Sequence, residues 1–129
     1  MSSVLNRIRR TLTELSAGDV KMEGVWYGAC SEKQLEYWNY FVFNRWKTSR
    51  RNASRIDFQT FYQVHVIHED YIPEGFVEKV IEALEAPDES GTKLRATGDD
   101  ITYNYTFKSN TGMVVEIATI TLYHPEKRC

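Results

Sequence analysis

The stretch from Phe58 to Ala86 changes its hydrophobic period half-way along, and this change constrains the fold more than any other feature. Up to His68 the residues alternate between two sides, which is typical of a half-buried β-strand. From Pro73 onwards the apolar residues recur at helical spacing, at Phe76, Val77, Val80, Ile81 and Leu84. We expect the helix to begin close to Pro73, whose missing N–H costs little in a first turn, and to stop at Pro87. The stretch therefore predicts a strand followed at once by a helix that packs on the sheet.

Residues 36–47, with the sequence EYWNYFVFNRWK, give the strongest strand signal. Phe41 and Phe43 are expected on one face. The other face collects Trp38, Tyr40, Val42 and Trp46. Because large side chains occupy both faces, we expect the core to cover one face and a neighbouring subunit to cover the other, since aromatic residues are enriched in interface cores.

The segment 47–57 joins these two strands and is predicted to be a long, mobile hairpin loop. Basic residues dominate it and the positions just before it: Arg45, Lys47, Arg50, Arg51 and Arg55. One interpretation is a solvated arm that contacts a neighbouring subunit. Another is contact with the phosphate backbone of a nucleic acid. A groove for single strands requires aromatic residues between the basic ones, and none lies between Lys47 and Arg55.

The two ends of the chain supply the other elements. An amphipathic helix is expected over residues 4–15, with Arg7, Arg9 and Arg10 on a solvated polar face or, alternatively, in contact with a partner or nucleic acid. Residues 19–36 show no clean period, but the glycines on either side of Trp26-Tyr27 suggest a short strand or a turn there. Residues 101–108 alternate as an amphipathic strand, a hairpin turn follows at 109–112, and residues 113–124 close the sheet.

These elements predict an α+β domain: a mainly antiparallel sheet of four or more strands with two helices packed on one face. The predicted order is helix-strand-strand-helix-strand-strand. A chain of 129 residues without an internal linker is expected to form a single domain.

Charge and composition exclude several classes of protein. A net charge of −2 creates no general attraction for nucleic acid or for an acidic membrane. No apolar run approaches the ~18 residues that span a bilayer, and the charged N-terminal MSSVLNRIRR does not read as a secretory leader. Cys30 and Cys129 lie far apart in the sequence, which favours reduced thiols over a disulfide framework.

The chain carries no recognisable catalytic motif of the dinucleotide, phosphate-loop or nucleophile-elbow type. His65 and His68 stand three apart on a strand and face opposite sides, so they do not share a metal. Glu116 is expected to pair with an arginine across a strand or across a subunit boundary rather than to act as a general base. The sequence therefore predicts no enzyme and no catalytic, cofactor-binding or metal-binding residue.

The order of elements resembles the tail-terminator and tail-completion (head–tail joining) proteins of long-tailed bacteriophages. The resemblance rests on the opening helix VLNRIRRTLTEL and on the long strands YWNYFVFNRWK and FQTFYQVHVIH with their extended loop. It also rests on the helix PEGFVEKVIEAL that follows the second strand, and on the two closing strands. It covers most of the chain as a pattern of elements and carries no active-site residues.

The resemblance implies a virion structural protein that assembles into a ring, often a hexamer. Such a ring caps the tail tube and joins it to the head connector. The implied partners are further copies of this chain, the tail tube protein and a head-completion protein, with DNA passing through the lumen without sequence specificity. The implied location is the virion, and the host cytoplasm during assembly. The interface or lumen candidates are Trp38, Tyr40, Arg45, Trp46, Lys47, Arg50, Arg51, Arg55 and Glu116.

Two other functions remain open. The aromatic segment 26–46 could line a pocket of a small-molecule-binding or enzymatic α+β domain, with Trp26, Tyr27, Trp38 and Tyr40 as its walls. The loop from Arg50 to Arg55 could instead serve a nucleic-acid-binding module.

Overall fold

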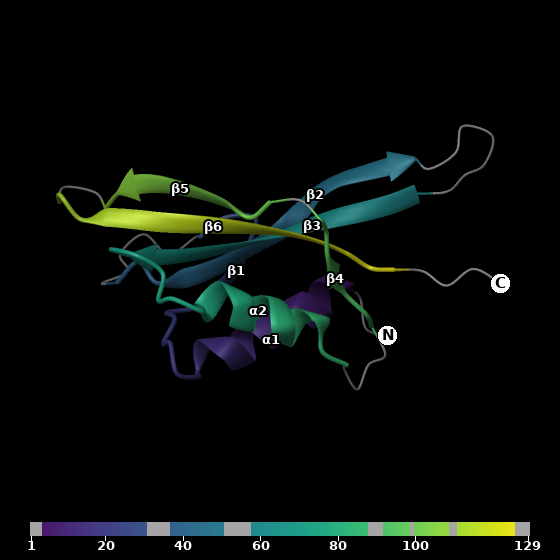
Figure 1. The fold of residues 1–129 in the computed structure, drawn as a ribbon, viewed down its shortest axis with the longest axis horizontal. Helices are drawn as coiled ribbons and strands as arrows, with labels where there is room; N and C mark the ends of the chain where they lie inside the picture. Colours follow the sequence, from purple (N-terminus) through teal and green to yellow (C-terminus); the bar gives the residue numbers. More distant parts are fainter. Residues whose placement is uncertain are drawn as a thin grey trace.

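The computed structural model describes residues 4–30, 37–50, 58–87, 92–98, 100–108 and 111–125. The helices are Val4–Ser16 (α1) and Phe76–Glu85 (α2). The strands are Val25–Tyr27 (β1), Tyr40–Arg50 (β2), Phe58–Glu69 (β3), Arg95–Ala96 (β4), Thr102–Phe107 (β5) and Val114–Tyr123 (β6). Both helices lie on the same side of a single long sheet, so the fold is α+β with two layers (Figure 1).

The sheet is mixed rather than mainly antiparallel, which corrects the predicted fold. Its order is β1-β2-β3-β6-β4, and β5 also pairs with β6. β1 runs parallel to β2, from Val25 opposite Phe41 to Tyr27 opposite Phe43. The chain also includes β1 and β4, which the predicted order lacked. The predicted order lacks β1 because the aperiodic segment 19–36 allows either a short strand or a turn at Trp26-Tyr27, and the two-residue β4 is too short to show a period.

The core lies between the helices and one face of the sheet. Phe41, Phe43, Val64 and Val66 point from the two central strands into this core, as the alternation predicted. The helices contribute their apolar stripes, which include the fully buried Ile8, Leu12, Val80 and Leu84. These buried side chains hold the helical layer against the sheet by the hydrophobic effect.

The opposite face of the sheet carries a smaller apolar cluster and a polar network. Val42, Ile67 and Val115 are buried there beneath Trp38, Tyr40 and Ile117. Beside them His65 lies between Asn44 Oδ1, 2.9 Å from its Nε2, and Thr119 Oγ1, 3.0 Å from its Nδ1. Burial lowers the pKa of His65, because the half-buried site penalises the charged imidazolium.

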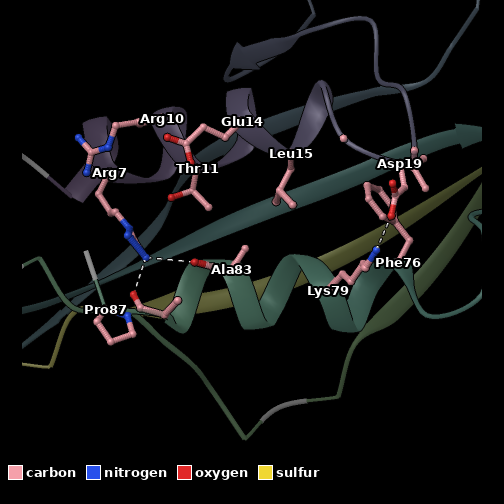
Figure 2. Close-up of a pocket in the computed structure, with 13 residues that line it drawn as sticks. Arg7, Arg10, Thr11, Glu14, Leu15, Asp19, Phe76, Lys79, Ala83 and Pro87 are labelled. Atoms are coloured by element: carbon pink, nitrogen blue, oxygen red, sulfur yellow. Dashed lines mark hydrogen bonds and ion pairs between the residues drawn. The ribbon is translucent and has the colours of Figure 1, made fainter. Parts of the chain in front are cut away.

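Arg7 is buried, which corrects the expectation that it lies on a solvated face. Its side chain is only 3% exposed and crosses from α1 to the C-terminal end of α2 (Figure 2). There Nη2 donates to the carbonyl oxygens of Ala83, Leu84 and Ala86 at 2.8–3.1 Å. A cation at a helix C-terminus satisfies carbonyls that have no partner within the helix. Arg9 and Arg10, by contrast, are exposed as expected.

Two predicted boundaries also change. α2 begins at Phe76 after Gly75, which caps it with a positive φ of 84°, so Pro73 lies before the helix rather than in its first turn. β2 continues through Arg50, so residues 47–50 of the predicted loop belong to a strand. The rest of that loop, residues 51–57, lies outside the described residues.

Among the described residues, neither helix is long and apolar enough to cross a membrane.

The Arg7 contact predicts a specific loss of stability. Replacing Arg7 by Met removes hydrogen bonds from a charged donor to buried carbonyls, so we expect the free energy of unfolding to fall by about 2 kcal/mol. Urea unfolding followed by circular dichroism measures this change. Arg10→Met, at an exposed position of the same helix, is the matched control and is expected to change stability by no more than about 0.5 kcal/mol. Equal effects of the two substitutions would contradict the assigned role of Arg7.

Candidate functional site

The apolar side of β5 faces solvent. Every residue of this strand is exposed, and its aromatic side chains become more exposed along the chain. Tyr103 is 45% exposed, Tyr105 62% and Phe107 65%. Tyr71, Met113 and Val114 are also exposed large apolar residues, and Val114 lies opposite Phe107 in the strand pairing. We call Tyr103, Tyr105, Phe107 and Val114 the β5 patch.

The β5 patch is exposed because the helical layer does not reach it. On the helix side of β6, Ala118, Ile120 and Leu122 are buried in the core, whereas Val114 near the hairpin turn is not. Figure 1 shows the β5–β6 hairpin extending past the helices at one end of the sheet. The sequence correctly showed an amphipathic strand, but its apolar side lacks the cover that such a strand normally has.

β5 is also an edge strand. It pairs with β6 on one side only, from Thr102 opposite Thr119 to Phe107 opposite Val114. No strand that the structure describes pairs with its other side. Soluble proteins usually protect such edges with proline, a bulge or inward charges, because a free edge recruits another strand. The six residues TYNYTF contain no proline and no charge.

A concave site of about 290 Å³ adjoins the β5 patch. Its lining includes Glu74, which precedes α2, and Glu78 in the first turn of α2, together with Tyr103 and Glu116. We call this site the acidic pocket. Glu116 accepts hydrogen bonds from the hydroxyl of Tyr105 at 2.8 Å and from the backbone N–H of Ile72 at 2.9 Å.

Glu116 was predicted to pair with an arginine across a strand or across a subunit boundary, and the pairing across a boundary stays a prediction. Its described partners are a phenol and a backbone N–H rather than a guanidinium. The hydrogen bond to Glu116 is the main reason why the pKa of Tyr105 is raised above its ordinary value. Glu116 therefore fixes the Tyr105 ring on the surface of the hairpin and links the hairpin to the segment that leads into α2.

The opposite edge of the sheet is basic. Arg9 of α1 lies over the ring of Phe43 at 5.1 Å and lines a hollow of about 280 Å³ together with Arg45 and Tyr27. Arg45 is exposed, and Tyr27 is 42% exposed. We call Arg9, Arg45 and Tyr27 the basic edge.

The far end of the β2–β3 ribbon carries a second aromatic group. A register shift between Arg45 and Lys47 marks a bulge at Trp46, whose ring lies 6.4 Å from that of Phe61. Lys47 Nζ lies 4.3 Å from the Trp46 ring centre and 5.2 Å from that of Phe61. Trp46 is 46% exposed, so the predicted interface residue does lie at the surface.

The other predicted candidates do not lie together in the part of the chain that the structure describes. Trp38 and Tyr40 cover the small apolar cluster on the outer face of the sheet, where Tyr40 meets Trp26 edge-on. The backbone of Arg50 ends β2. Arg51 and Arg55 lie outside the described residues. The structure therefore does not gather all nine candidates into one site.

Glu69 connects the chain before β2 to the end of β5. Its carboxylate accepts hydrogen bonds from the backbone N–H of Trp38 at 2.9 Å and from the ammonium of Lys108. Burial acts to raise the pKa of Glu69, but these bonds and the positive charge of Lys108 outweigh it and lower the pKa below 4.5. The half-buried ion pair holds the base of the β5–β6 hairpin to the central strands.

A third cavity, of about 540 Å³, lies between the helices and is larger than both the acidic pocket and the hollow at the basic edge (Figure 2). Arg7 lies near one end of this groove, and an ion pair of 3.1 Å between Lys79 and Asp19 lies at the other. The predicted aromatic pocket differs from all three cavities. Trp26, Trp38 and Tyr40 line none of them, and only Tyr27 lines the hollow at the basic edge.

Within the described ranges, no cluster of three or more histidine, cysteine or acidic residues has the geometry to hold a metal ion. His65 and His68 take part in separate contacts. His65 joins the outer-face network, and His68 Nδ1 lies 2.8 Å from the carbonyl oxygen of Glu69.

Comparison with known proteins adds evidence about the fold alone. No protein-family model matches the sequence, and no curated protein matches it significantly. Seventeen chains of solved structures do match. One of them superposes with a TM-score of 0.54 over 98% of this chain and 96% of its own, at 14% identity, and its name describes no function. Such a likeness supports a shared fold and does not identify an activity.

The contacts of Glu69 predict how stability depends on pH. Its pKa is lower in the folded chain than the ordinary 4.5, so its contribution is present above that pH and is lost as pH falls through the folded value. We expect Glu69→Gln to flatten the fall in unfolding free energy below about pH 4.5, as measured by urea titrations between pH 7 and pH 3. Glu82→Gln, an exposed carboxylate of α2, serves as the control and should follow the parent curve. Parallel curves for Glu69→Gln and the parent would contradict this account.

Proposed function

We propose that this chain is a structural protein that works by self-assembly, in the manner of the tail-terminator proteins that its element order resembles. The observation that carries the proposal is the β5 patch. It presents two tyrosines, a phenylalanine and a valine on a strand that has a free edge. Contiguous exposed apolar surface of this kind marks a protein–protein interaction site.

The position of the β5 patch supports assembly over ligand binding. A small-molecule site is concave and encloses its ligand, whereas the aromatic residues of β5 stand on an open strand at one end of the sheet. The exposed aromatic residues at the other end, Trp46 and Phe58, give the molecule a second surface suited to contact. A chain with two separate contact surfaces can join a neighbour on each side, which is what a ring requires.

In full, the proposed assembly is a ring that closes the tail tube and meets a head-completion protein. Its copies would number six, as the resemblance implies. The basic residues Arg50, Arg51 and Arg55 would then border the lumen through which DNA passes. Because the contacts are with the phosphate backbone, they would be independent of base sequence.

The solution mass of the purified protein tests the proposal. Light scattering on a sizing column should show a discrete ring-sized species, alone or increasing with protein concentration, and negative-stain images of that species should show a central opening. A strict monomer across the accessible concentrations would contradict self-assembly of the free protein.

A single charge in the β5 patch should block assembly. Phe107 is 65% exposed in the monomer, so we expect Phe107→Lys to change the unfolding free energy by no more than about 0.5 kcal/mol. The same change should shift the mass to the monomer, because it places an ammonium group inside an apolar contact. Thr13→Lys, at an exposed position on α1, is the control and should assemble like the parent. An unchanged mass for Phe107→Lys would exclude the β5 patch as the contact.

A further inference from the structure

We infer that assembly is head-to-tail, with β5 of one copy pairing with the free part of β2 of the next copy. This inference rests on the proposed self-assembly and names the two surfaces that meet. The partner is a second copy of this chain. The result is a sheet that continues from one subunit into its neighbour.

The first argument is that the two edges match in length. β1 covers only Phe41, Val42 and Phe43 of β2. From Asn44 to Arg50 the same side of β2 has no strand beside it among the described residues. This free part has seven residues, and the free edge of β5 has the six residues Thr102–Phe107. Each edge can therefore satisfy the backbone groups that the other leaves unpaired.

The second argument is charge. The acidic pocket beside β5 carries Glu74, Glu78 and Glu116, whereas the basic edge beside β2 carries Arg9 and Arg45. Glu116 remains close to the junction through its bond to Tyr105. Both groups lie on the helix side of the sheet, so joining the two edges brings opposite charges to the same face. A pairing of β5 with a second β5 would instead bring the acidic pockets together, which like charges oppose.

The third argument is direction. β2, β3, β6 and β5 are joined by successive antiparallel pairings, so β5 runs opposite to β2 within one chain. Copies related by rotation about an axis roughly along the strands would therefore pair β5 with β2 in antiparallel fashion. The two free segments lie at opposite ends of the sheet, as Figure 1 shows. β5 of one copy therefore comes level with the free part of β2 in the next copy only if the strands are inclined to the ring axis. Closed barrels meet the same requirement by tilting their strands.

Cross-linking between two different single-cysteine chains tests the pairing. In a background of Cys30→Ser and Cys129→Ser, one chain carries Asn104→Cys in β5 and the other carries Ser49→Cys in β2. The two chains are mixed, allowed to assemble and treated with a short bismaleimide. We expect covalent dimers in the mixture and several-fold fewer in either chain alone, because a head-to-tail contact places position 104 beside the neighbour's position 49.

The outcomes separate this inference from the proposed function. An assembled species that yields no mixed dimer would overturn the β5–β2 pairing and leave self-assembly in place. Dimers formed by the Asn104→Cys chain alone would overturn it in favour of a two-fold contact between β5 strands. A strict monomer in every mixture would contradict both proposals.

Charge reversal gives a second, independent measurement. Arg45→Glu should raise the concentration needed for half-assembly by roughly tenfold or more, because it places a carboxylate against the acidic pocket. Combining it with Glu74→Arg should recover most of that loss. Arg10→Glu, in the groove between the helices, is the control and should assemble like the parent. If the double variant assembles no better than Arg45→Glu alone, opposite charges do not meet across the contact.

Discussion

The buried guanidinium of Arg7 links the two helices, and together with the apolar core beneath them it forms the helical layer on the sheet. By donating to the last carbonyls of α2, Arg7 joins the two helices at one end of their contact. The exposed pair of Lys79 and Asp19 joins them at the other, with less effect because exposed ion pairs contribute little. The helical layer therefore covers the central strands and leaves the β5–β6 hairpin bare.

The hairpin that remains uncovered is nevertheless firmly placed. Glu69 ties its base to the start of β2 through Lys108 and Trp38, and Glu116 ties Tyr105 to the segment before α2. A strand held in this way presents its aromatic residues without first having to order them. Such preorganisation favours association, because less conformational freedom is lost when the partner arrives.

The sequence was sufficient to predict the elements that bury a regular stripe. The alternation in β3 and the helical spacing after Pro73 predicted a strand and a helix, and both are present. The sequence could not decide between a short strand and a turn at Trp26-Tyr27, because Val25–Tyr27 is too short to show a period and pairs in parallel with β2, a distant segment's strand. It also gave no sign that Arg7 would differ from Arg9 and Arg10, since the C-terminal end of α2 is far away in the chain.

The sequence predicts the strand that carries the β5 patch but not the exposure of that patch. Tyr103, Tyr105 and Phe107 were correctly placed on one side of a strand, yet the two predicted helices were too few to cover every strand. The short α2, from Phe76 to Glu85, leaves one end of the sheet without a layer. The helical layer is shorter than the sheet, and the β5–β6 hairpin is the part of the sheet that it leaves exposed.

Hydrogen–deuterium exchange at low and high protein concentration tests the central claim most directly. The account predicts that amides of Thr102–Phe107 in β5 and of residues 44–50 in β2 become slower to exchange as concentration rises, while those of α1 and α2 change little. Exchange in these two segments that stays the same at every concentration, in a protein whose mass shows assembly, would contradict it.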